Sequence, residues 1–424
     1  MADILRDIIR RNRNGAPVAI VSVCTAHPQV LLACLKRAAE LREPLVVEAT
    51  SNQVNQDGGY TGMTPADFIS FVTDLGKTAD FPLNQLVFGG DHLGPQVWRK
   101  QPADDAMAKA RVMIADYVKA GFSKIHLDCS EGCAGEPAQV GDAIAAARAA
   151  DLARVAIAAS AMPNALLFII GTEVPPPGGA RMDESGDIPP TTPASALATL
   201  AAHRKAFISA GLEPVLPQIG GLVVQPGVEF SPMHVHPMPL SRDPGFRAVL
   251  QDWPNLCLEA HSTDYQHPAV FRRLSALGFA FQKVGPALTF AWREAVYGLD
   301  ALAQIAGWTD AEPLPQVMER LMLANPASWS AHYHASSGDL RVQRHFGLAD
   351  RIRYYWPQPE AQAAVQNLFA ALKDRDLPAP MLKQVFGPAR IARAGTHPTA
   401  ESLAAAAVSL ALDPYFLDLR EPTP

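Results

Sequence analysis

The pair Asp91 and His92 follows the apolar segment Leu86-Val-Phe-Gly-Gly90 and precedes Pro95, and its residue types are well suited to chemistry. Imidazole is a frequent ligand of borderline metals, and a carboxylate beside a Lewis acid can move protons. Neighbouring side chains on a strand point to opposite faces, so both groups reach one site only if the strand has ended, as the glycines and Pro95 indicate. The alternative is that Asp91 caps the next helix and that His92 bonds a backbone carbonyl.

Eight short apolar runs, each ending in polar or charged residues, recur along the chain. They cover residues 18–24, 45–48, 86–88, 124–128, 166–173, 222–225, 256–261 and 279–283. Alanine-rich segments with helical periodicity, such as 103–120 and 192–210, lie between them, and Gly121, Gly211 and Gly278 stand where several of these should end. Nearly all-apolar strands that alternate with helices predict a parallel sheet covered on both faces. The count of eight favours a closed (β/α)8 TIM barrel over an open doubly wound sheet, and no G-x-G-x-x-G follows an early strand.

The pattern changes after about residue 298, where helical segments follow one another without a convincing strand. The clearest are 314–324, 360–372 and 400–412. We therefore expect a barrel over residues 1–298 and a helical C-terminal extension over 299–424 that packs on it. Aromatic and basic residues cluster within 341–356; most of the aromatics should pack on the barrel, whereas Arg351 and Arg353 could equally lie at a partner interface.

The composition argues against a nucleic-acid-binding protein, a membrane protein and a secreted disulfide-rich protein. The 424 residues are 48% hydrophobic, which is enough for a large core, and the net charge of -6 gives no basic footprint for nucleic acid. No run approaches the roughly 20 apolar residues of a membrane span, and the first residues lack a signal-peptide core, so we expect a cytoplasmic protein. The five cysteines are odd in number and not densely spaced, and Cys129 and Cys133 have no second pair nearby to complete a zinc site, which predicts reduced thiols.

The polar residues that end the apolar runs are the candidate site, because a barrel of this kind builds its active site at the carboxyl ends of its strands. Two histidines and several carboxylates on that rim could bind a divalent metal with an open position. Each residue also has a structural alternative: Asp128 could cap a helix, Glu173 could pair with an arginine, and Lys283 could form a barrel salt bridge. The full set of candidates is Gln53, Asn55, Asp91, His92, Asp128, Ser130, Glu173, Gln225, Glu229, His261, Ser262, Asp264 and Lys283.

Long motifs of the chain resemble the non-catalytic subunits of class II D-tagatose-1,6-bisphosphate aldolase. They lie at 48–67, 89–95, 120–128, 171–175, 224–230, 259–266, 283–289 and 350–357, and the match spans nearly the whole chain. The resemblance implies an accessory protein of galactitol or N-acetylgalactosamine breakdown, with a catalytic class II aldolase subunit as its partner. Members of this family have also been labelled tagatose-6-phosphate kinases, but the chain has no G-x-x-x-x-G-K-[ST] loop to hold a nucleotide phosphate.

This family is similar in turn to the catalytic class II aldolases, which are zinc-dependent barrels with an Asp-His pair after the third strand. That resemblance implies an acid/base role for Asp91, in which Asp128 and Glu173 could share, and metal binding by His92 and His261. The sixth run differs, because it has Gln225-Pro-Gly-Val-Glu229 where the catalytic enzymes carry another histidine. With one imidazole fewer, Glu173, Gln225 or Glu229 would have to complete a mixed shell for Zn or Mn.

Two functions follow. The chain is either an accessory subunit that stabilises a catalytic aldolase, or a metal-dependent epimerase or aldolase that acts on a ketose or ketose phosphate. Some accessory relatives are reported to epimerise free ketohexoses at carbon 4. The family name favours the first function, and the polar residues at the strand ends favour the second. The substrate-binding side chains would then be Gln53, Asn55, Ser130, Gln225, Glu229, Ser262, Asp264 and Lys283, and a homo-oligomer is compatible with both functions.

Overall fold

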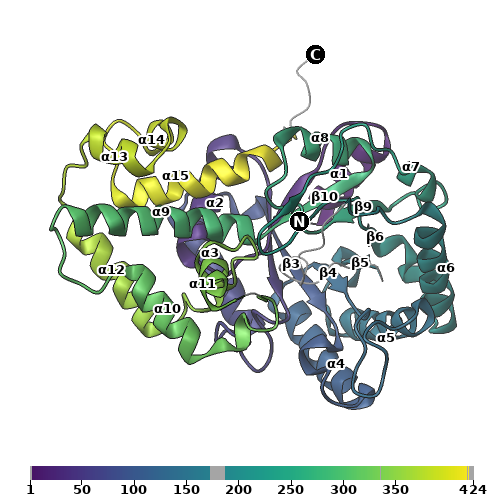
Figure 1. Ribbon diagram of the computed structural model, residues 1–424. Helices are drawn as coiled ribbons and strands as arrows, with labels where there is room; N and C mark the ends of the chain where they lie inside the picture. Colours follow the sequence, from purple (N-terminus) through teal and green to yellow (C-terminus); the bar gives the residue numbers. More distant parts are fainter. Residues whose placement is uncertain (1, 172–186, 335, 418, 420–424) are drawn as a thin grey trace.

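The computed structural model describes residues 2–171, 187–334, 336–417 and 419. Eight parallel strands close into a barrel in the order β1-β10-β9-β6-β5-β4-β3-β2 (Figure 1). This confirms the predicted (β/α)8 fold. The strands are β1 (Ile20–Val23), β2 (Leu45–Thr50), β3 (Leu86–Leu93), β4 (Lys124–Leu127), β5 (Leu167–Ile170), β6 (Ile219–Val223), β9 (Cys257–Ala260) and β10 (Phe279–Val284).

Helices surround the barrel and connect successive strands. They are α2 (Pro28–Leu41), α3 (Pro65–Thr78), α4 (Ala103–Ala120), α5 (Asp142–Ala159), α6 (Pro193–Ser209), α8 (Pro268–Ala276) and α9 (Pro286–Ile305). Proline begins α2, α3, α6, α8 and α9, where its missing N–H costs nothing because the first turn has no acceptor. Gly121 ends α4 with a φ of 114°, and Gly278 follows α8 with a φ of 107°, a conformation that side chains rarely adopt. The predicted helix at 103–120 is confirmed at both ends.

Short elements complete the barrel unit. The 3-10 turns η1 (Leu83–Gln85), η2 (Pro95–Trp98), η3 (Pro163–Ala165) and η4 (Glu213–Gln218) flank strands β3, β5 and β6. Between β6 and β9 the chain forms an antiparallel pair, β7 (Glu229–Phe230) with β8 (Val235–His236), followed by α7 (Phe246–Val249). The segment Gln225-Pro-Gly-Val-Glu229, which follows β6, therefore leads into a small β-hairpin.

The barrel interior has an apolar end and a charged end. Helix α1 (Ala2–Arg13) closes the apolar end, where Leu5, Ile8 and Ile9 pack with inward-facing Val46 and Phe281. Toward the carboxyl ends of the strands the inward positions carry charge instead. Those buried charged side chains are Glu48, Asp91, Lys124, Glu259 and Lys283. Since an isolated buried charge is very costly, this layer must be internally paired.

The helical C-terminal extension packs against one side of the barrel (Figure 1). Helix α9 runs through the expected boundary at residue 298, and the last long helix, α15, packs on α9 and α2. The division into two domains itself stays a prediction. The extension contains α10 (Leu314–Ala324), η5 (Pro326–Ser328), α11 (Ser337–Phe346), η6 (Arg351–Tyr354), α12 (Pro359–Leu372), α13 (Ala379–Val385), α14 (Pro388–Ala394), α15 (Ala400–Leu412) and η7 (Asp413–Tyr415).

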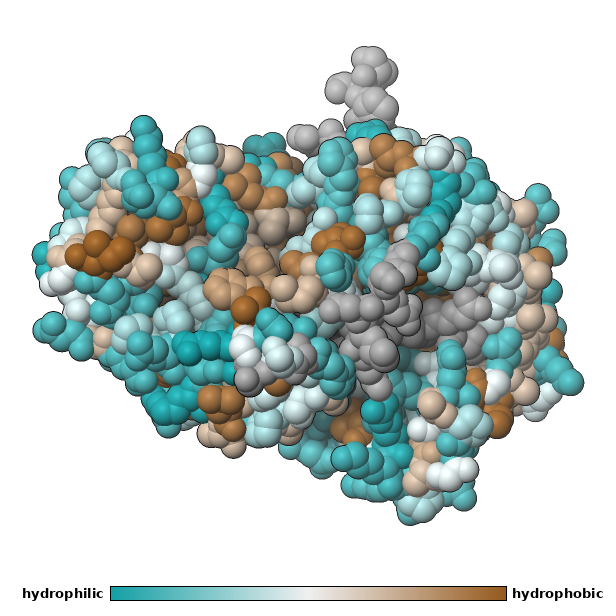
Figure 2. Space-filling view, in the orientation of Figure 1, coloured by the Kyte–Doolittle hydropathy of each residue, from teal (hydrophilic) through white to brown (hydrophobic). Residues whose placement is uncertain are grey.

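The described surface mixes residue types. On the face in Figure 2, apolar residues lie singly or in small groups among hydrophilic ones. Within the described ranges, no helix has both the length and the apolar content that crossing a bilayer requires. All five cysteines are free thiols, as predicted.

A buried ion pair joins the extension to the barrel helix α9. Arg293 Nε donates to Asp350 Oδ1 at 2.8 Å, and Thr289 Oγ1 donates to Asp350 Oδ2 at 2.5 Å. We expect Asp350→Ala to lower the free energy of unfolding by about 3–5 kcal/mol, because it leaves the Arg293 guanidinium buried without a counter-ion. Urea unfolding followed by tryptophan fluorescence measures this.

Two controls test the cause of that loss. Asp350→Asn keeps an acceptor and tolerates the left-handed backbone at this position, where φ is 44°, so it should lose less stability than the alanine variant. Glu360→Ala breaks an exposed ion pair with Arg320 in the same extension and should unfold near the wild-type midpoint. Equal losses in the Asp350→Ala and Glu360→Ala variants would contradict the buried-pair account.

Candidate functional site

Strand β3 delivers Asp91 and His92 to the same interior without ending. The strand continues to Leu93, so the expectation that it stops before the pair is corrected. His92 has a φ of 48°, and the register with β4 shifts between Gly90 and Leu93. This irregularity turns two successive side chains inward, which regular strand alternation forbids. A non-glycine residue in the left-handed region is held there by its surroundings, and such strain often marks a functional site.

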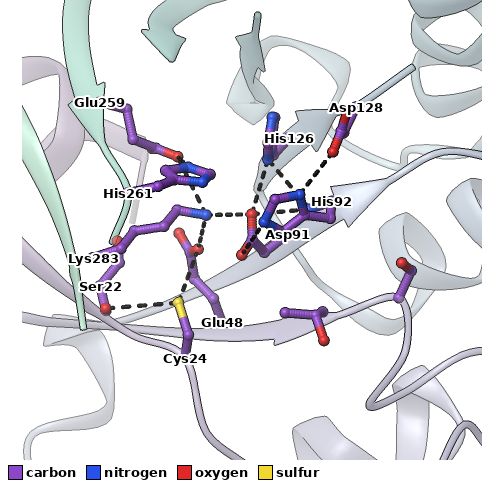
Figure 3. A network of polar contacts seen from close by, with 12 residues as sticks. Ser22, Cys24, Glu48, Asp91, His92, His126, Asp128, Glu259, His261 and Lys283 are labelled. Atoms are coloured by element: carbon purple, nitrogen blue, oxygen red, sulfur yellow. Dashed lines mark hydrogen bonds and ion pairs between the residues drawn. The ribbon is translucent and has the colours of Figure 1, made fainter. Parts of the chain in front are cut away.

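Lys283 lies at the centre of the charged layer (Figure 3). Its Nζ atom is 2.7 Å from Glu48 Oε2 and 3.3 Å from Glu259 Oε1, and it also forms an ion pair with Asp91 Oδ1. Burial would lower the pKa of Lys283, but Asp91, Glu259 and Glu48 outweigh burial and hold the pKa well above its usual value. Lys283 is therefore an ammonium ion at neutral pH and lacks the free amine needed for Schiff-base chemistry.

Lys124 forms the second cation of this layer. Its Nζ atom is 2.6 Å from Glu48 Oε1 and 2.5 Å from Glu259 Oε2. Glu48 and Glu259 thus each form ion pairs with both lysines. Together with Asp91 they make three carboxylates against two ammonium groups. Burial would raise the pKa of Asp91, but His92, Lys283 and a hydrogen bond with His126 hold the pKa well below its usual value. Asp91 is therefore an ionised carboxylate at neutral pH.

Three imidazoles meet above these charges (Figure 3). The ring centroids of His92 and His126 are 5.2 Å apart, those of His92 and His261 are 5.2 Å apart, and those of His126 and His261 are 5.3 Å apart. Sequence reasoning missed His126, which lies on β4. Its signal was present, because Lys124 and His126 alternate within an apolar run and therefore face the barrel interior together.

Each imidazole binds a carboxylate through one ring nitrogen. His92 Nδ1 is 2.7 Å from Asp128 Oδ2, His126 Nδ1 is 2.8 Å from Asp91 Oδ1, and His261 Nε2 is 2.8 Å from Glu259 Oε1. A carboxylate on one nitrogen is the usual support of a metal-binding histidine, since it orients the ring and leaves the other nitrogen for the ion.

A ring nitrogen of His126 and one of His261 bind no carboxylate and could bind a metal ion. His126 Nε2 is buried and has no hydrogen-bond partner among the described residues, an arrangement that costs free energy unless a ligand completes it. Three imidazoles around one tetrahedral ion would place their ring centroids roughly 5 Å apart, given metal–nitrogen distances of about 2.1 Å. Donor atoms of Asp91, His126, Glu259 and His261 lie within 4.8 Å of one another, a group that contains two of the three imidazoles and not His92.

The pKa shifts favour metal binding by His261 and indicate that His92 must first lose a proton. Burial and the Lys283 ammonium lower the pKa of His261 to about 3, so its imidazole is neutral and able to bind an ion. Burial would lower the pKa of His92, but Asp91 and Asp128 outweigh it and raise the pKa. Metal binding at His92 would therefore release a proton.

The structure brings together most of the residues proposed for catalysis and metal binding. Asp91, His92, Asp128, His261 and Lys283 all lie in this buried cluster. Ser130 Oγ donates to Asp128 Oδ1 at 2.6 Å and so orients the carboxylate that supports His92. Glu173 lies outside the described residues.

Three other predicted residues accept hydrogen bonds from backbone N–H groups near them. Asn55 Oδ1 accepts from the backbone N–H groups of Asp57 and Gly59, and Gln225 Oε1 accepts from those of Gly227 and Val228. These bonds shape the loops after β2 and β6. Glu229 Oε1 similarly accepts from the N–H of Phe230, its own neighbour in β7. A substrate-binding role for these three residues stays a prediction.

A cavity opens above the charged cluster at the carboxyl ends of the strands. Asp91, His92, His261 and Lys283 form its base, and Gln53, Ser262 and Asp264 lie in its wall. Burial raises the pKa of Asp264 to about 6, although the N–H groups of Ala287 and Gly285 lower it. Sequence reasoning missed three further lining residues, Tyr60, Arg353 and Tyr354. Arg353 and Tyr354 come from η6, so the extension completes the cavity.

Comparisons with known proteins agree with this architecture. Residues 5–419 match the family described as D-tagatose-1,6-bisphosphate aldolase subunit GatZ/KbaZ-like. The D-tagatose 6-phosphate 4-epimerase of Agrobacterium fabrum is 46% identical over 421 residues, which cover 98% of each chain.

Solved structures show the same fold. A probable tagatose 6-phosphate kinase from Sinorhizobium meliloti superposes with a TM-score of 0.86 and 46% identity, over 94% of this chain and 99% of that one. The fructuronate-tagaturonate epimerase of Cohnella laeviribosi superposes with a TM-score of 0.50 and 14% identity, over 94% of this chain and 82% of the other, which is a likeness of fold alone.

Proposed function

Because the chain belongs to the D-tagatose-1,6-bisphosphate aldolase subunit GatZ/KbaZ-like family, we propose that it is a metal-dependent 4-epimerase of ketohexose 6-phosphates. The observation that carries the proposal is the cluster of three carboxylate-supported imidazoles at the base of a cavity. A scaffold protein has no physical need for such a cluster, since each buried polar group costs free energy unless it is satisfied. The name of the relative in Agrobacterium fabrum supports D-tagatose 6-phosphate as substrate and hence D-fructose 6-phosphate as product.

The metal ligands in this proposal are His92, His126 and His261. A divalent ion such as Zn or Mn would supply a Lewis acid that polarises the ketose carbonyl and the adjacent hydroxyl. His126 replaces, in this scheme, the third imidazole that the sixth strand lacks. Glu173, Gln225 and Glu229 are then not required to complete the shell.

Asp91 is the proposed base. Its Oδ1 atom contacts Lys283 and His126, and its Oδ2 atom, which lies 3.6 Å from His92 Nε2, would accept the proton of the C4 hydroxyl. As that proton leaves, the C3–C4 bond breaks, its electron pair passes into the enediolate of the C1–C3 fragment, and C4 becomes an aldehyde. The aldehyde turns its other face to C3, the bond forms again, and Asp91 returns the proton to the C4 oxygen. No oxidant or reductant is consumed.

Lys283 stabilises the charge that develops in this scheme. An ammonium ion held by three carboxylates is already positioned and dehydrated, so it needs no reorganisation when the enediolate forms. Its high pKa keeps it charged, and it therefore acts as an electrostatic and hydrogen-bonding group.

Direct assay tests the proposed activity. The full chain, incubated with Mn or Zn, should interconvert D-tagatose 6-phosphate and D-fructose 6-phosphate, as separated and quantified by chromatography. A chelator should abolish the conversion and added metal should restore it. No conversion of ketoses or their 6-phosphates with any of several divalent metals would refute the epimerase.

The accessory role is the second candidate, and the description of the matched family as an aldolase subunit favours it. In that case the chain should bind and stabilise a catalytic class II aldolase subunit through its surface. Asp91→Asn should not change that stabilisation, because Asp91 is buried at the base of the cavity. Failure to bind or stabilise such a subunit would count against the accessory role.

A further inference from the structure

Arg353 and Tyr354 of η6 line the active-site cavity, and the nearby Arg351 packs on the ring of Tyr354. Arg353 lines this cavity and also a neighbouring one between the barrel and α12, and Tyr60 lines both as well. The guanidinium carbons of Arg351 and Arg353 lie 4.4 and 4.6 Å from the ring centroid of Tyr354. The ring of Tyr60 meets that of Tyr354 edge to face, with centroids 4.6 Å apart.

The loop after β2 is built to present Tyr60. Gly59 has a φ of 55°, and a Cβ atom there would lie 2.4 Å from the carbonyl oxygen of Gln53. Asn55 fixes the same turn through the N–H of Gly59, and Tyr60 N–H donates to the Asn52 carbonyl at 3.0 Å. Glycine is therefore required at position 59, and the turn holds Tyr60 against η6.

Within the described residues, Arg353 uses only part of its hydrogen-bonding capacity. Its Nη1 atom donates to the carbonyls of Ala349 and Asp350, and its Nη2 atom donates to the Tyr354 hydroxyl at 3.0 Å. These bonds account for three of the five N–H hydrogens of a guanidinium. The protein backbone thus fixes the orientation of Arg353 while two donors remain for a ligand.

Arg353 lines the cavity without an ion-pair partner among the described residues, unlike the lysines at the cavity base. Within the described residues, neither Arg351 nor Arg353 has a carboxylate at ion-pair distance, whereas Lys283 and Lys124 are fully paired. Burial would raise the pKa of Tyr354, but the two guanidiniums outweigh burial and lower it. An arginine that is fixed, half-buried and without a carboxylate is a suitable receptor for an anionic ligand group.

We infer that Arg353, supported by Arg351 and flanked by Tyr60 and Tyr354, binds the phosphate of the ketose phosphate and thereby selects phosphorylated over free sugars. The inference rests on the proposed function and deepens it, since it assigns the phosphate end of the substrate to the opening and the reacting carbons to the base. It also gives the C-terminal extension a role, because η6 supplies a substrate-specifying residue to a barrel that supplies the chemistry.

The test compares phosphorylated and free substrate in one variant. For Arg353→Gln, kcat/KM for D-tagatose 6-phosphate divided by kcat/KM for D-tagatose should fall about 30-fold, mainly through KM, as expected for loss of a charge-assisted bond. Arg353→Lys should recover part of this ratio, because it keeps the charge but not the planar fork. Arg320→Gln removes an exposed charge from the same extension and is the matched control, in which the ratio should not change.

Binding measurements separate this inference from the proposed activity. By calorimetry, the full chain should bind D-tagatose 6-phosphate more tightly than D-tagatose, and Arg353→Gln should remove that preference while Arg320→Gln retains it. If no turnover is found but this preference depends on Arg353, the epimerase proposal fails and the phosphate site stands. If the wild-type chain shows no preference for the phosphate ester, or if Arg353→Gln weakens the binding of both ligands equally, the phosphate site is refuted, whether or not the chain is an epimerase.

Discussion

Asp91→Asn is expected to lower the rate of ketose 6-phosphate epimerisation by about 100-fold or more, the usual scale for loss of a general acid or base. The amide has nearly the same shape as the carboxylate, and it can still accept a hydrogen bond at Oδ1. It cannot take the C4 hydroxyl proton at Oδ2, so the C3–C4 bond has no route to break. Initial rates at saturating substrate measure the effect, because kcat should fall while binding of the substrate is largely kept.

Two controls exclude a general loss of structure. Asp74→Asn removes an exposed carboxylate of α3 that pairs with Lys77, and it should leave kcat unchanged. Thermal unfolding of the Asp91→Asn variant should show a single cooperative transition, because Lys283 keeps Glu48 and Glu259 as partners. A folded Asp91→Asn protein with more than about a tenth of the wild-type kcat would remove Asp91 from the role of base.

The fold could be predicted from sequence because its signals are local. Each strand is a short apolar run bounded by polar residues, and glycines such as Gly121 and Gly278 mark helix ends by a backbone conformation that other residues avoid. The helices at 314–324 and 400–412 likewise begin and end where their periodicity does. These features require no knowledge of contacts between distant segments.

The candidate site was only partly predictable, because two of its features are not local. His126 and Glu259 lie within strands and face inward, so a search of the residues that end the strands misses them. Glu48 ends the predicted run 45–48 but is not among the candidates, and it also lies within its strand. Period-two alternation of polar residues inside an apolar run would have identified them. The approach of Arg353 to the cavity depends on how η6 packs over the barrel, and nothing in its local sequence specifies that contact.

The histidine that this chain lacks after its sixth strand also has a different explanation once the positions in space are known. Sequence comparison with catalytic aldolases looks for a histidine after the sixth strand, where this chain has Gln225-Pro-Gly-Val-Glu229 and forms the β7–β8 hairpin. In space, His126 reaches the same cluster from β4, with its ring 5.2–5.3 Å from those of His92 and His261. A barrel can supply equivalent donors from different strands, since all strand ends face one interior.

His126→Ala should therefore abolish high-affinity binding of a divalent ion. Wild-type protein dialysed against Zn or Mn should retain about one ion per chain, held by three imidazoles. Loss of a ligand should weaken binding by more than the roughly 10- to 100-fold that loss of an outer-shell partner costs. Elemental analysis after dialysis measures the stoichiometry, and the double variant His92→Ala/His261→Ala should show the same loss.

The matched control for this prediction is His203→Ala. His203 is also a buried imidazole, but it lies on α6 and bonds the backbone carbonyl of Thr199 at 2.8 Å, away from the cluster. Its removal should cost stability without changing the bound metal. Asp128→Asn should give an intermediate result, because it weakens the support of His92 Nδ1 without removing a ligand. If His126→Ala keeps one ion per chain while the double variant loses it, the metal is held by His92 and His261 with an oxygen ligand, and His126 serves only to orient Asp91.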